Sequence, residues 1–296
     1  MIFGYQNNTM VGIVLINYHS EDELTAFVKN ELQHIKVPYK IVVVNNSYSE
    51  SSEECLRKGF TTHGLEHLLD TTIFIITKNE NLGYARANNF GATFLKSKFQ
   101  LDYLLFSNTD IVFTDIDVVE TLIHQLQILP KEVAAIGPRV VGLDGKDQSP
   151  HAEISFKRYF AWNAFPFLKG QFKFLQKKKN ETSYILKNDY CYWVSGCFVM
   201  VKAKDFFEAK LFDETTFLYG EEKMLSERLL KNNKRTYFYA DATILHQHGG
   251  TTTQHIKNNK RDKMVFENEC YYYSKYKNVQ KVMIKVLKAI YAIKTR

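Results

Sequence analysis

An apolar stretch that stops at a single carboxylate is the part of the sequence with the clearest chemical meaning. Residues 101–106 form this stretch, and the polar residues that follow it are Ser107, Asn108, Thr109 and Asp110. The pattern predicts a buried strand with Asp110 at its C-terminal end, where open α/β sheets bind their ligands. A carboxylate there can hold Mg²⁺ or Mn²⁺ together with phosphate oxygens. An acid in an ordinary strand-end turn has the same pattern, so Asp110 alone does not distinguish a metal site from such a turn.

A second candidate is the polar segment of residues 79–91, which follows an apolar run and opens a predicted helix. Gly83 at its turn lets backbone N–H groups approach an anion closely, and Arg86 can pair with a phosphate. The segment lacks the Gly-Lys-Ser/Thr ending of a Walker loop, and it is not a Gly-x-Gly-x-x-Gly turn. It therefore indicates either a nucleotide-binding turn or an ordinary helix start with amide caps.

Two further pairs of residues carry groups that can act on a proton or a metal. Glu221 and Glu222 follow a glycine at a predicted helix start. Either one can be a general base for a hydroxyl, or both can serve only to stabilise the helix dipole. His246 and His248 point to one face of a strand end, where they can bind a metal or a diphosphate or lie on the surface. No His-Glu-x-x-His motif or cysteine accompanies them, so a zinc site is not indicated.

The composition excludes several classes of protein. The chain has 296 residues, and 45% of them are hydrophobic, which is enough for a large core. Its net charge of +7 fits solubility, an anionic ligand or an anionic membrane. No zinc finger, RNP motif or Arg-rich arm points to nucleic acid. The four cysteines lack Cys-x-x-Cys spacing, so no disulfide framework is expected. Without a secretory signal or a bilayer-length apolar run, we expect a cytoplasmic protein.

Apolar runs alternate with helical segments through the first half of the chain. The runs are residues 11–16, 40–44, 73–76 and 101–106. This alternation predicts a mostly parallel sheet with right-handed crossovers. Because polar residues follow each run, Asn17, Asn45, Asn79 and Asp110 are expected along one edge of that sheet.

The second half is less regular. The predicted elements are a short strand and turn at 133–138, a loop-rich region at 144–190, a strand at 192–201, short strands at 236–239 and 242–245, and helix over 262–296. Residues 281–296 combine lysines with apolar residues and contain no acid. Such a segment can dock on anionic lipid, or it can pack on the protein with a solvated basic face.

The order of these motifs is more specific than any one of them. Taken together, they resemble the family 2 glycosyltransferases with a GT-A fold, most closely the bacterial rhamnosyltransferase-like branch that builds surface polysaccharides. The resemblance covers residues 10–275. It rests on Asn45-Asn46-Ser47, the Asn-x-Asn-Leu-Gly-Tyr-Ala-x-Ala-Asn-Asn-x-Gly pattern of residues 79–91, Asn108-Thr109-Asp110, Trp193-Val194-Ser195-Gly196, Gly220-Glu221-Glu222 and His246-x-His-Gly-Gly.

The resemblance implies a Rossmann-like, mixed but mostly parallel sheet flanked by helices. It implies a GT-A domain over 9–250, with a nucleotide-sugar half at 9–130 and an acceptor half at 131–250, and a helical basic extension at 251–296. The implied nucleotide-sugar residues are Asn17, Asn45, Asn79, Gly83, Arg86, Asn89, Asn108, Thr109, Trp193 and Gly196. The implied metal ligands are Asp110 and His246 or His248. Glu222 matches the presumed catalytic base, and Glu221 precedes it.

The implied reaction is displacement with inversion, in which a UDP- or dTDP-sugar reacts with a hydroxyl of a glycan or a lipid-linked acceptor in the presence of Mg²⁺ or Mn²⁺. The sequence departs from the family pattern at three places. Asn45 stands where relatives often have Asp, Glu222 replaces the Asp of a Glu-Asp motif, and Lys223 and Met224 stand where another acid is common.

Two other functions remain open from the sequence. A nucleotidyltransferase also uses a strand-end Asp with Mg²⁺, but it usually needs a Gly-rich basic loop, and residues 17–20 do not form one. A degenerate relative would bind a nucleotide sugar without transferring it. Turnover that depends on Asp110 and Glu222 would distinguish an enzyme from such a binding protein.

Overall fold

The computed structural model describes residues 9–47, 49–165, 186–247 and 258–295. Its strands are β1 (Val11–Asn17), β2 (Tyr39–Asn45), β3 (Ile73–Thr77), β4 (Tyr103–Ser107), β5 (Ile111–Phe113), β6 (Val133–Gly142), β7 (Asp189–Cys191), β8 (Phe198–Lys202) and β9 (Arg235–His246). Its α-helices are α1 (Glu21–Asn30), α2 (Glu50–Thr62), α3 (Gly83–Lys98), α4 (Val118–Ile128), α5 (Phe156–Ala164), α7 (Ala203–Glu208), α8 (Glu221–Lys231), α10 (Asn258–Tyr276) and α11 (Lys281–Lys294).

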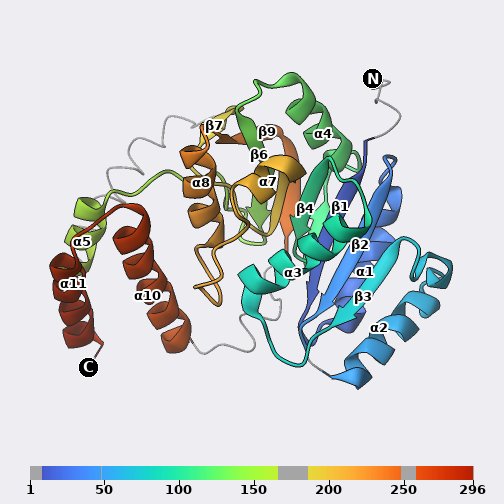
Figure 1. Ribbon diagram of the computed structural model, residues 1–296, viewed down its shortest axis with the longest axis horizontal. Helices are drawn as coiled ribbons and strands as arrows, with labels where there is room; N and C mark the ends of the chain where they lie inside the picture. The colour runs from blue at the N-terminus through green and yellow to red at the C-terminus, as the bar shows by residue number, and fades with distance from the viewer. Residues whose placement is uncertain (1–8, 48, 166–185, 248–257, 296) are drawn as a thin grey trace.

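The strands form one mixed sheet with the order β3-β2-β1-β4-β8-β6-β9-β5, and β7 pairs with β9 (Figure 1). Strands β3, β2, β1 and β4 are parallel, as the alternation of apolar runs and helices predicted. Strand β8 joins β4 antiparallel, so the start of β8 lies at the same edge as the end of β4. This edge therefore collects residues from both halves of the chain.

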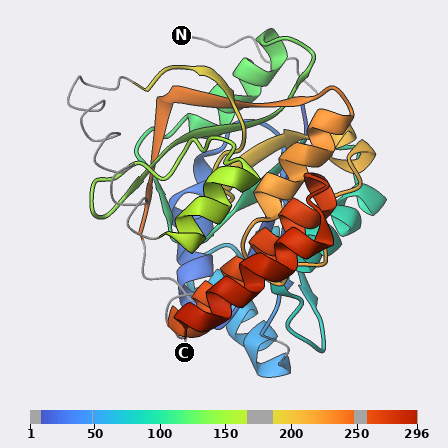
Figure 2. The same cartoon turned by 90° about the vertical axis from the view of Figure 1, so that its left-hand side faces the viewer.

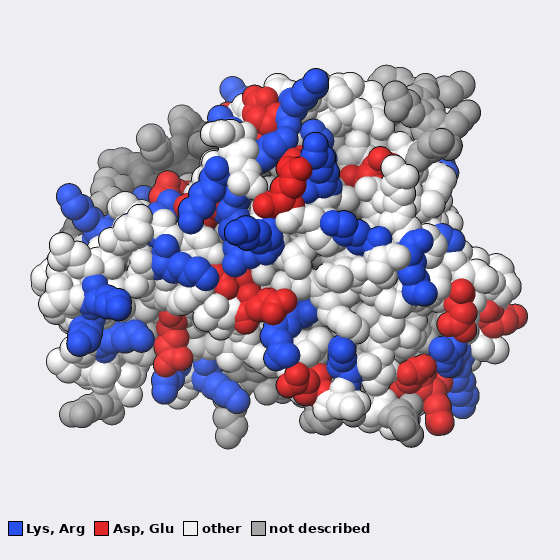
Figure 3. Space-filling view, in the orientation of Figure 1, with Lys and Arg blue, Asp and Glu red and all other residues white. Residues whose placement is uncertain are grey.

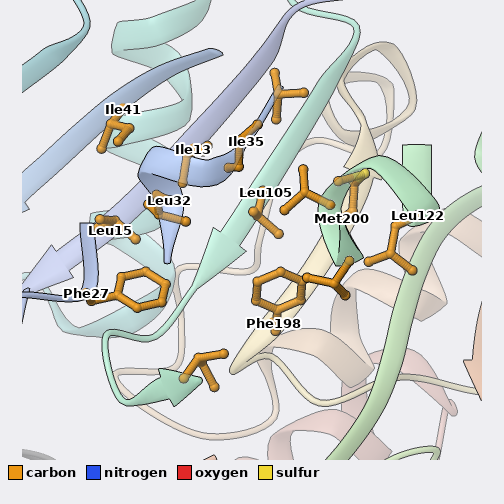
Figure 4. Packing of buried hydrophobic residues seen from close by; sticks show 14 of the residues in the cluster. Ile13, Leu15, Phe27, Leu32, Ile35, Ile41, Leu105, Leu122, Phe198 and Met200 are labelled. Carbon is orange, nitrogen blue, oxygen red and sulfur yellow. The ribbon is translucent and has the colours of Figure 1, made fainter. Parts of the chain in front are cut away.

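Side chains on the two faces of the sheet build two separate apolar clusters. Along β1, Ile13 and Leu15 face one cluster while Val14 faces the other, as the period of two in a strand requires. Figure 4 shows the first cluster, where Phe27 of α1 packs near Leu15 and Phe198 lies near Leu122 of α4. Helix α3 covers the other face, and burial on both faces explains why the first strands read as continuous apolar runs.

Three expectations for the second half were wrong. Strand β6 continues through Pro138 to Gly142, because a register shift between Pro138 and Arg139 accommodates the missing N–H. Residues 235–246 form one strand, β9, and not two short ones. Residues 192–197 are not a strand; they connect β7 to β8 and include Gly196.

The C-terminal helices pack on the rest of the protein through an aromatic cluster. Tyr272 and Tyr273 of α10 are buried with Met224 of α8 and with Ile284 and Leu287 of α11. Figure 2 shows α10 and α11 side by side, next to α5 and α8. The helical prediction for residues 262–296 is confirmed for residues 262–276 and Lys281–Lys294, but residues 277–280 form a break between the two helices. None of the helices in the described residues has the length and apolar character needed to cross a membrane.

Candidate active site

Two asparagines close the C-terminal ends of β1 and β2. Asn17 and Asn45 are paired in register and fully buried, and Asn17 Nδ2 lies 3.1 Å from Asn45 Oδ1. Ser52 donates its hydroxyl to Asn45 Oδ1 at 2.9 Å and also bonds Glu21. Ser47 lies 3.2 Å from Asn17 Nδ2. These predicted nucleotide residues therefore belong to a hydrogen-bonded network beneath the surface of the edge.

The predicted nucleotide turn is built around Gly83, which has a φ of +70° and is buried. A Cβ at this position would lie 2.3 Å from the carbonyl oxygen of Phe217, and that same oxygen accepts the Tyr84 N–H at 2.8 Å. The glycine thus permits close contact between α3 and the segment before α8. Asn79 is exposed, and Arg86 is exposed and paired with Glu80 at 2.9 Å.

Asn89 also joins α3 to the segment before α8. It is buried, its Oδ1 accepts the Phe212 N–H at 3.0 Å, and its Nδ2 donates to the Phe212 carbonyl at 3.0 Å. The same Nδ2 lies 2.9 Å from Glu214 Oε1. All of these contacts are with other residues of the protein. Asn89 therefore holds the segment of residues 209–220 against α3.

Asp110 and His246 meet where the turn after β4 passes the end of β9. The side chain of Asp110 is 12% exposed, and its Oδ1 lies 3.2 Å from His246 Nε2. Asn108 Nδ2 is 3.4 Å from the same nitrogen, and His246 Nδ1 is 2.8 Å from Gln148 Oε1. Burial opposes a charged ring, but the interactions with Asp110 and Cys197 together outweigh it and raise the pKa of His246 to about 10. Thr109 lies at the same turn and donates to Glu23 Oε1 at 2.6 Å.

The acid pair lies at the first turn of α8, directly after two residues with left-handed backbone. Tyr219 has a φ of +75° and Gly220 a φ of +95°. Glu221 is 1% exposed, and its Oε1 has no hydrogen-bond partner among the described residues. Burial, reinforced by the charge of Glu222, raises the pKa of Glu221 to about 8. A buried carboxylate with one oxygen left unpaired is uncommon and marks a candidate functional group.

Glu222 is partly buried and contacts the backbone of Gly196. A Cβ at Gly196 would lie only 1.9 Å from Glu222 Oε1, so the glycine makes room for this carboxylate. The Tyr84 hydroxyl donates to the Gly196 carbonyl at 2.7 Å, which fixes the segment from the other side. Burial raises the pKa of Glu222, while the Gly196 N–H lowers it.

Gly196 and Cys197 form a short segment that links the Asp110–His246 pair to Glu222. The Cys197 carbonyl accepts the Asn108 N–H at 2.8 Å, two residues before Asp110. Gly196 contacts Glu222. The structure thus brings Asp110, His246 and Glu222 to one edge of the sheet, although they are far apart in the sequence. His248 lies outside the described residues.

An aromatic pair borders this region. Trp193 stacks on His151 with ring centroids 3.6 Å apart and an angle of 11° between the planes. Burial lowers the pKa of His151 to about 4, so the ring is neutral at pH 7. Sequence reasoning found Trp193 but missed His151, because nothing near residue 151 in the sequence indicates the contact. Gln148 was missed for the same reason.

The comparisons with known proteins identify the family and the fold. The model of "Glycosyl transferase family 2" matches residues 12–193. Rhamnosyltransferase WbbL from Escherichia coli (strain K12) is 24% identical over 244 residues, which are 80% of this chain and 83% of WbbL.

Among the solved structures that share the fold at low sequence identity, two show how the chains superpose. The mannosyltransferase PcManGT from Pyrobaculum calidifontis, in complex with GDP-Man and Mn²⁺, superposes with a TM-score of 0.56 at 12% identity, covering 95% of this chain and 68% of that one. The structure of GalNAc-T7 with UDP, GalNAc and Mn²⁺ superposes with a TM-score of 0.55 at 12% identity, and the match covers 97% of this chain and 55% of the GalNAc-T7 chain. The family model spans more than half of this chain, and the predicted fold class is confirmed. The chain therefore belongs to glycosyl transferase family 2 and is a glycosyltransferase with a GT-A fold.

Proposed function

We propose that this chain is an inverting hexosyltransferase that moves a sugar from a UDP- or dTDP-sugar to a hydroxyl of a glycan or a lipid-linked acceptor. Its similarity to a rhamnosyltransferase supports a deoxyhexose as the transferred group. The observation that carries the proposal is the convergence of Asp110, His246 and Glu222 at one sheet edge through the Gly196–Cys197 segment.

The donor set at this edge fits a divalent metal. Mg²⁺ and Mn²⁺ accept a site with one carboxylate when phosphate oxygens complete the coordination. Asp110 supplies the carboxylate. His246 Nε2 lies beside it and faces the same carboxylate. A metal bound at Asp110 would take the place of the Nε2 proton, while Gln148 Oε1 accepts the proton of Nδ1. When bound, the metal would neutralise charge on the departing diphosphate. The two solved structures described above are complexes with Mn²⁺.

Glu222 is the proposed base. In the transfer step, the acceptor oxygen forms a bond to the anomeric carbon while the bond from that carbon to the diphosphate oxygen breaks. The acceptor proton passes to the Glu222 carboxylate. A single displacement of this kind inverts the anomeric centre, whereas retention would need a protein nucleophile and a second displacement. The partly buried position of Glu222 raises its pKa above that of an exposed carboxyl, which makes it a stronger base for the acceptor proton.

Release of nucleoside diphosphate tests the proposal directly. Purified protein with Mn²⁺ is incubated with dTDP-rhamnose, UDP-glucose, UDP-galactose and GDP-mannose, with and without glycan acceptors. We expect turnover with a UDP- or dTDP-sugar, loss on chelation with EDTA, and at least about a 100-fold loss in Asp110→Asn. Asp115→Asn, which changes an exposed acid nearby, is the matched control. Binding of a donor with no transfer under any of these conditions would instead identify a degenerate relative.

We also propose that α11 contacts a membrane surface. Ile284 and Leu287 face the protein, and the opposite side of the helix exposes Val282, Val286 and Ile293, of which Ile293 is 74% exposed. Lysines at 281, 285 and 288 form an adjoining exposed stripe, and basic side chains gather at this end of the molecule in Figure 3. An apolar outer stripe beside lysines is the pattern of a helix that lies in an anionic interface. This arrangement favours docking over a merely solvated basic face.

Flotation with vesicles tests this contact. We expect the protein to float with phosphatidylcholine vesicles that contain phosphatidylglycerol, and to float less after the joint change Val282→Ser, Val286→Ser and Ile293→Ser. Ile128→Ser removes an exposed apolar side chain from α4 and is the control. Equal flotation of the wild type and the triple variant would reject the membrane contact without bearing on glycosyl transfer.

A further inference from the structure

The turn that delivers the acid pair has an unfavourable backbone conformation. Tyr219 and Gly220 are both left-handed, and they precede Glu221 without an intervening residue. Glycine adopts this conformation readily, but a residue with a Cβ does so at a cost of about 1–2 kcal/mol. Something outside the turn must therefore hold Tyr219 in place, because the turn decides where the first carboxylates of α8 point.

A side chain from α10 contacts the turn at this point. Asn268 Nδ2 lies 2.6 Å from the Leu218 carbonyl oxygen and 2.9 Å from that of Tyr219. The amide nitrogen has two hydrogens, so it can donate to both carbonyls at once. Leu218 and Tyr219 thus have their carbonyls turned toward α10, and this direction accompanies the left-handed backbone of Tyr219.

Neighbouring residues of α10 hold the helix against the same region. Glu269 forms an ion pair with Lys223, which follows Glu222 in α8. Further along, the buried Asp213 carboxylate accepts the Tyr276 hydroxyl at 2.6 Å and lies 3.0 Å from Lys275 Nζ. These contacts anchor α10 at both sides of the turn, so Asn268 is held firmly where it meets the two carbonyls.

We propose that Asn268 is a positioning residue for the acid pair. By donating to the carbonyls of Leu218 and Tyr219, it holds the left-handed turn that places Glu221 and Glu222 at the start of α8, with Glu222 against Gly196. Its role is to act through the turn that carries the acid pair. The role in catalysis rests on the proposed function above, but the structural coupling between α10 and the start of α8 does not. Nothing in the Glu-Glu motif itself indicates this dependence on a residue 46 positions beyond Glu222 in the sequence.

Two substitutions separate the hydrogen bonds from mere packing. Asn268→Leu fills the space without any N–H, and Asn268→Asp keeps the shape but presents oxygen atoms to two carbonyl oxygens. Asn259→Leu makes the same change at an exposed position of the same helix and is the matched control. For each variant we would measure thermal unfolding, donor KM and kcat with dTDP-rhamnose and UDP-glucose as probes, and backbone hydrogen exchange by mass spectrometry.

We expect both Asn268 variants to lose about 10- to 100-fold in kcat, with donor KM within about threefold of the wild type, because a misplacement of about 1 Å suffices for such losses. Exchange at the amides of residues 221–224 should rise in both variants and stay unchanged in Asn259→Leu. Wild-type kcat in a folded Asn268→Asp would overturn the positioning role, and so would unchanged exchange at 221–224. If the wild type itself releases no nucleoside diphosphate, the proposed function fails, and the exchange measurement still decides whether Asn268 holds the turn.

Discussion

Two polar clusters at one edge of the sheet differ in how they are held. The cluster around Asn17 and Asn45 comes from the ends of neighbouring strands and satisfies itself with hydrogen bonds among its own members. The acid pair of α8 is held by distant elements: by Gly196 before β8, by Tyr84 from α3 and by Asn268 from α10. Within the part of the chain that the structure describes, one Glu221 oxygen remains without a partner.

This difference separates stabilising from reactive polar groups. Buried amides with satisfied donors and acceptors add stability and hold the strand ends in register. A carboxylate that is buried without full compensation destabilises the fold and has a raised pKa, which suits a group that must exchange a proton. We therefore expect changes around Asn17 and Asn45 to affect mainly the free energy of unfolding, and changes at Glu222 and the residues that hold it to affect mainly turnover.

The largest expected effect in this comparison comes from Glu222→Gln. The amide keeps the shape and the contact with Gly196 but cannot accept the acceptor proton, so kcat should fall about 100- to 1,000-fold with donor binding retained. Glu221→Gln, the adjacent control, should lose less than about tenfold. The measurements are kcat and the dissociation constant of the donor. A larger loss in Glu221→Gln than in Glu222→Gln would reverse the assignment of the base.

Gly196→Ala should be the next most severe change. The added Cβ would meet Glu222 Oε1 at 1.9 Å, so the carboxylate must move away from its present contact. We expect kcat to fall about 10- to 100-fold, and stability to fall by about 1–3 kcal/mol from overpacking. A second Gly→Ala change at Gly64 is an unsuitable control, because Gly64 has a φ of +71° and an alanine there would strain the backbone. Ser195→Ala changes the preceding residue without adding volume and serves better. Full activity in Gly196→Ala would show that the position of Glu222 is not critical.

The sequence predicted the parts of the fold that follow from local patterns. The buried parallel strands appeared as apolar runs, and Asp110, Asn17 and Asn45 were placed by the polar residues that end those runs. The start of α8 was visible from Gly220 and the two acids after it. Strand β6 was predicted too short because Pro138 is a strong turn signal, whereas in the sheet its missing N–H falls at a register shift.

The rest could not be predicted because it depends on contacts between distant segments. Nothing around Asn268 distinguishes it from any other asparagine on a polar helix face. Gln148 is 98 positions from His246 yet bonds its ring. The function of Gly196 becomes clear only when Glu222 is seen beside it.

In the polar cluster around Asn17 and Asn45, Asn17→Ala should mainly lower the free energy of unfolding. The substitution leaves Asn45, Ser47 and Ser52 without one of their partners in a fully buried site, and each unsatisfied group costs about 1–3 kcal/mol. We expect a loss of about 2–4 kcal/mol in the free energy of unfolding from urea denaturation. Turnover by the folded fraction should change by less than about threefold. A stable variant whose turnover falls as far as that of Glu222→Gln would contradict the separation of the two clusters.

A final expected effect is a pH dependence of stability that comes from Glu221. Burial first, and the neighbouring Glu222 second, raise its pKa from 4.5 to about 8 in the folded state. Between these values the unfolded carboxyl is ionised while the folded one keeps its proton, so the folded state binds more protons and stability falls as pH rises through this window. Glu221→Gln has no proton to lose. Its melting temperature should therefore rise relative to that of the wild type by about 5–7 °C as pH rises from 5 to 8, and the difference should level off above pH 8. Any constant offset from the buried amide cancels, because only the change in the difference with pH is compared. Parallel melting curves of the two proteins over this range would mean that Glu221 is ionised in the folded state, and the contrast between the two clusters would then lose its electrostatic basis.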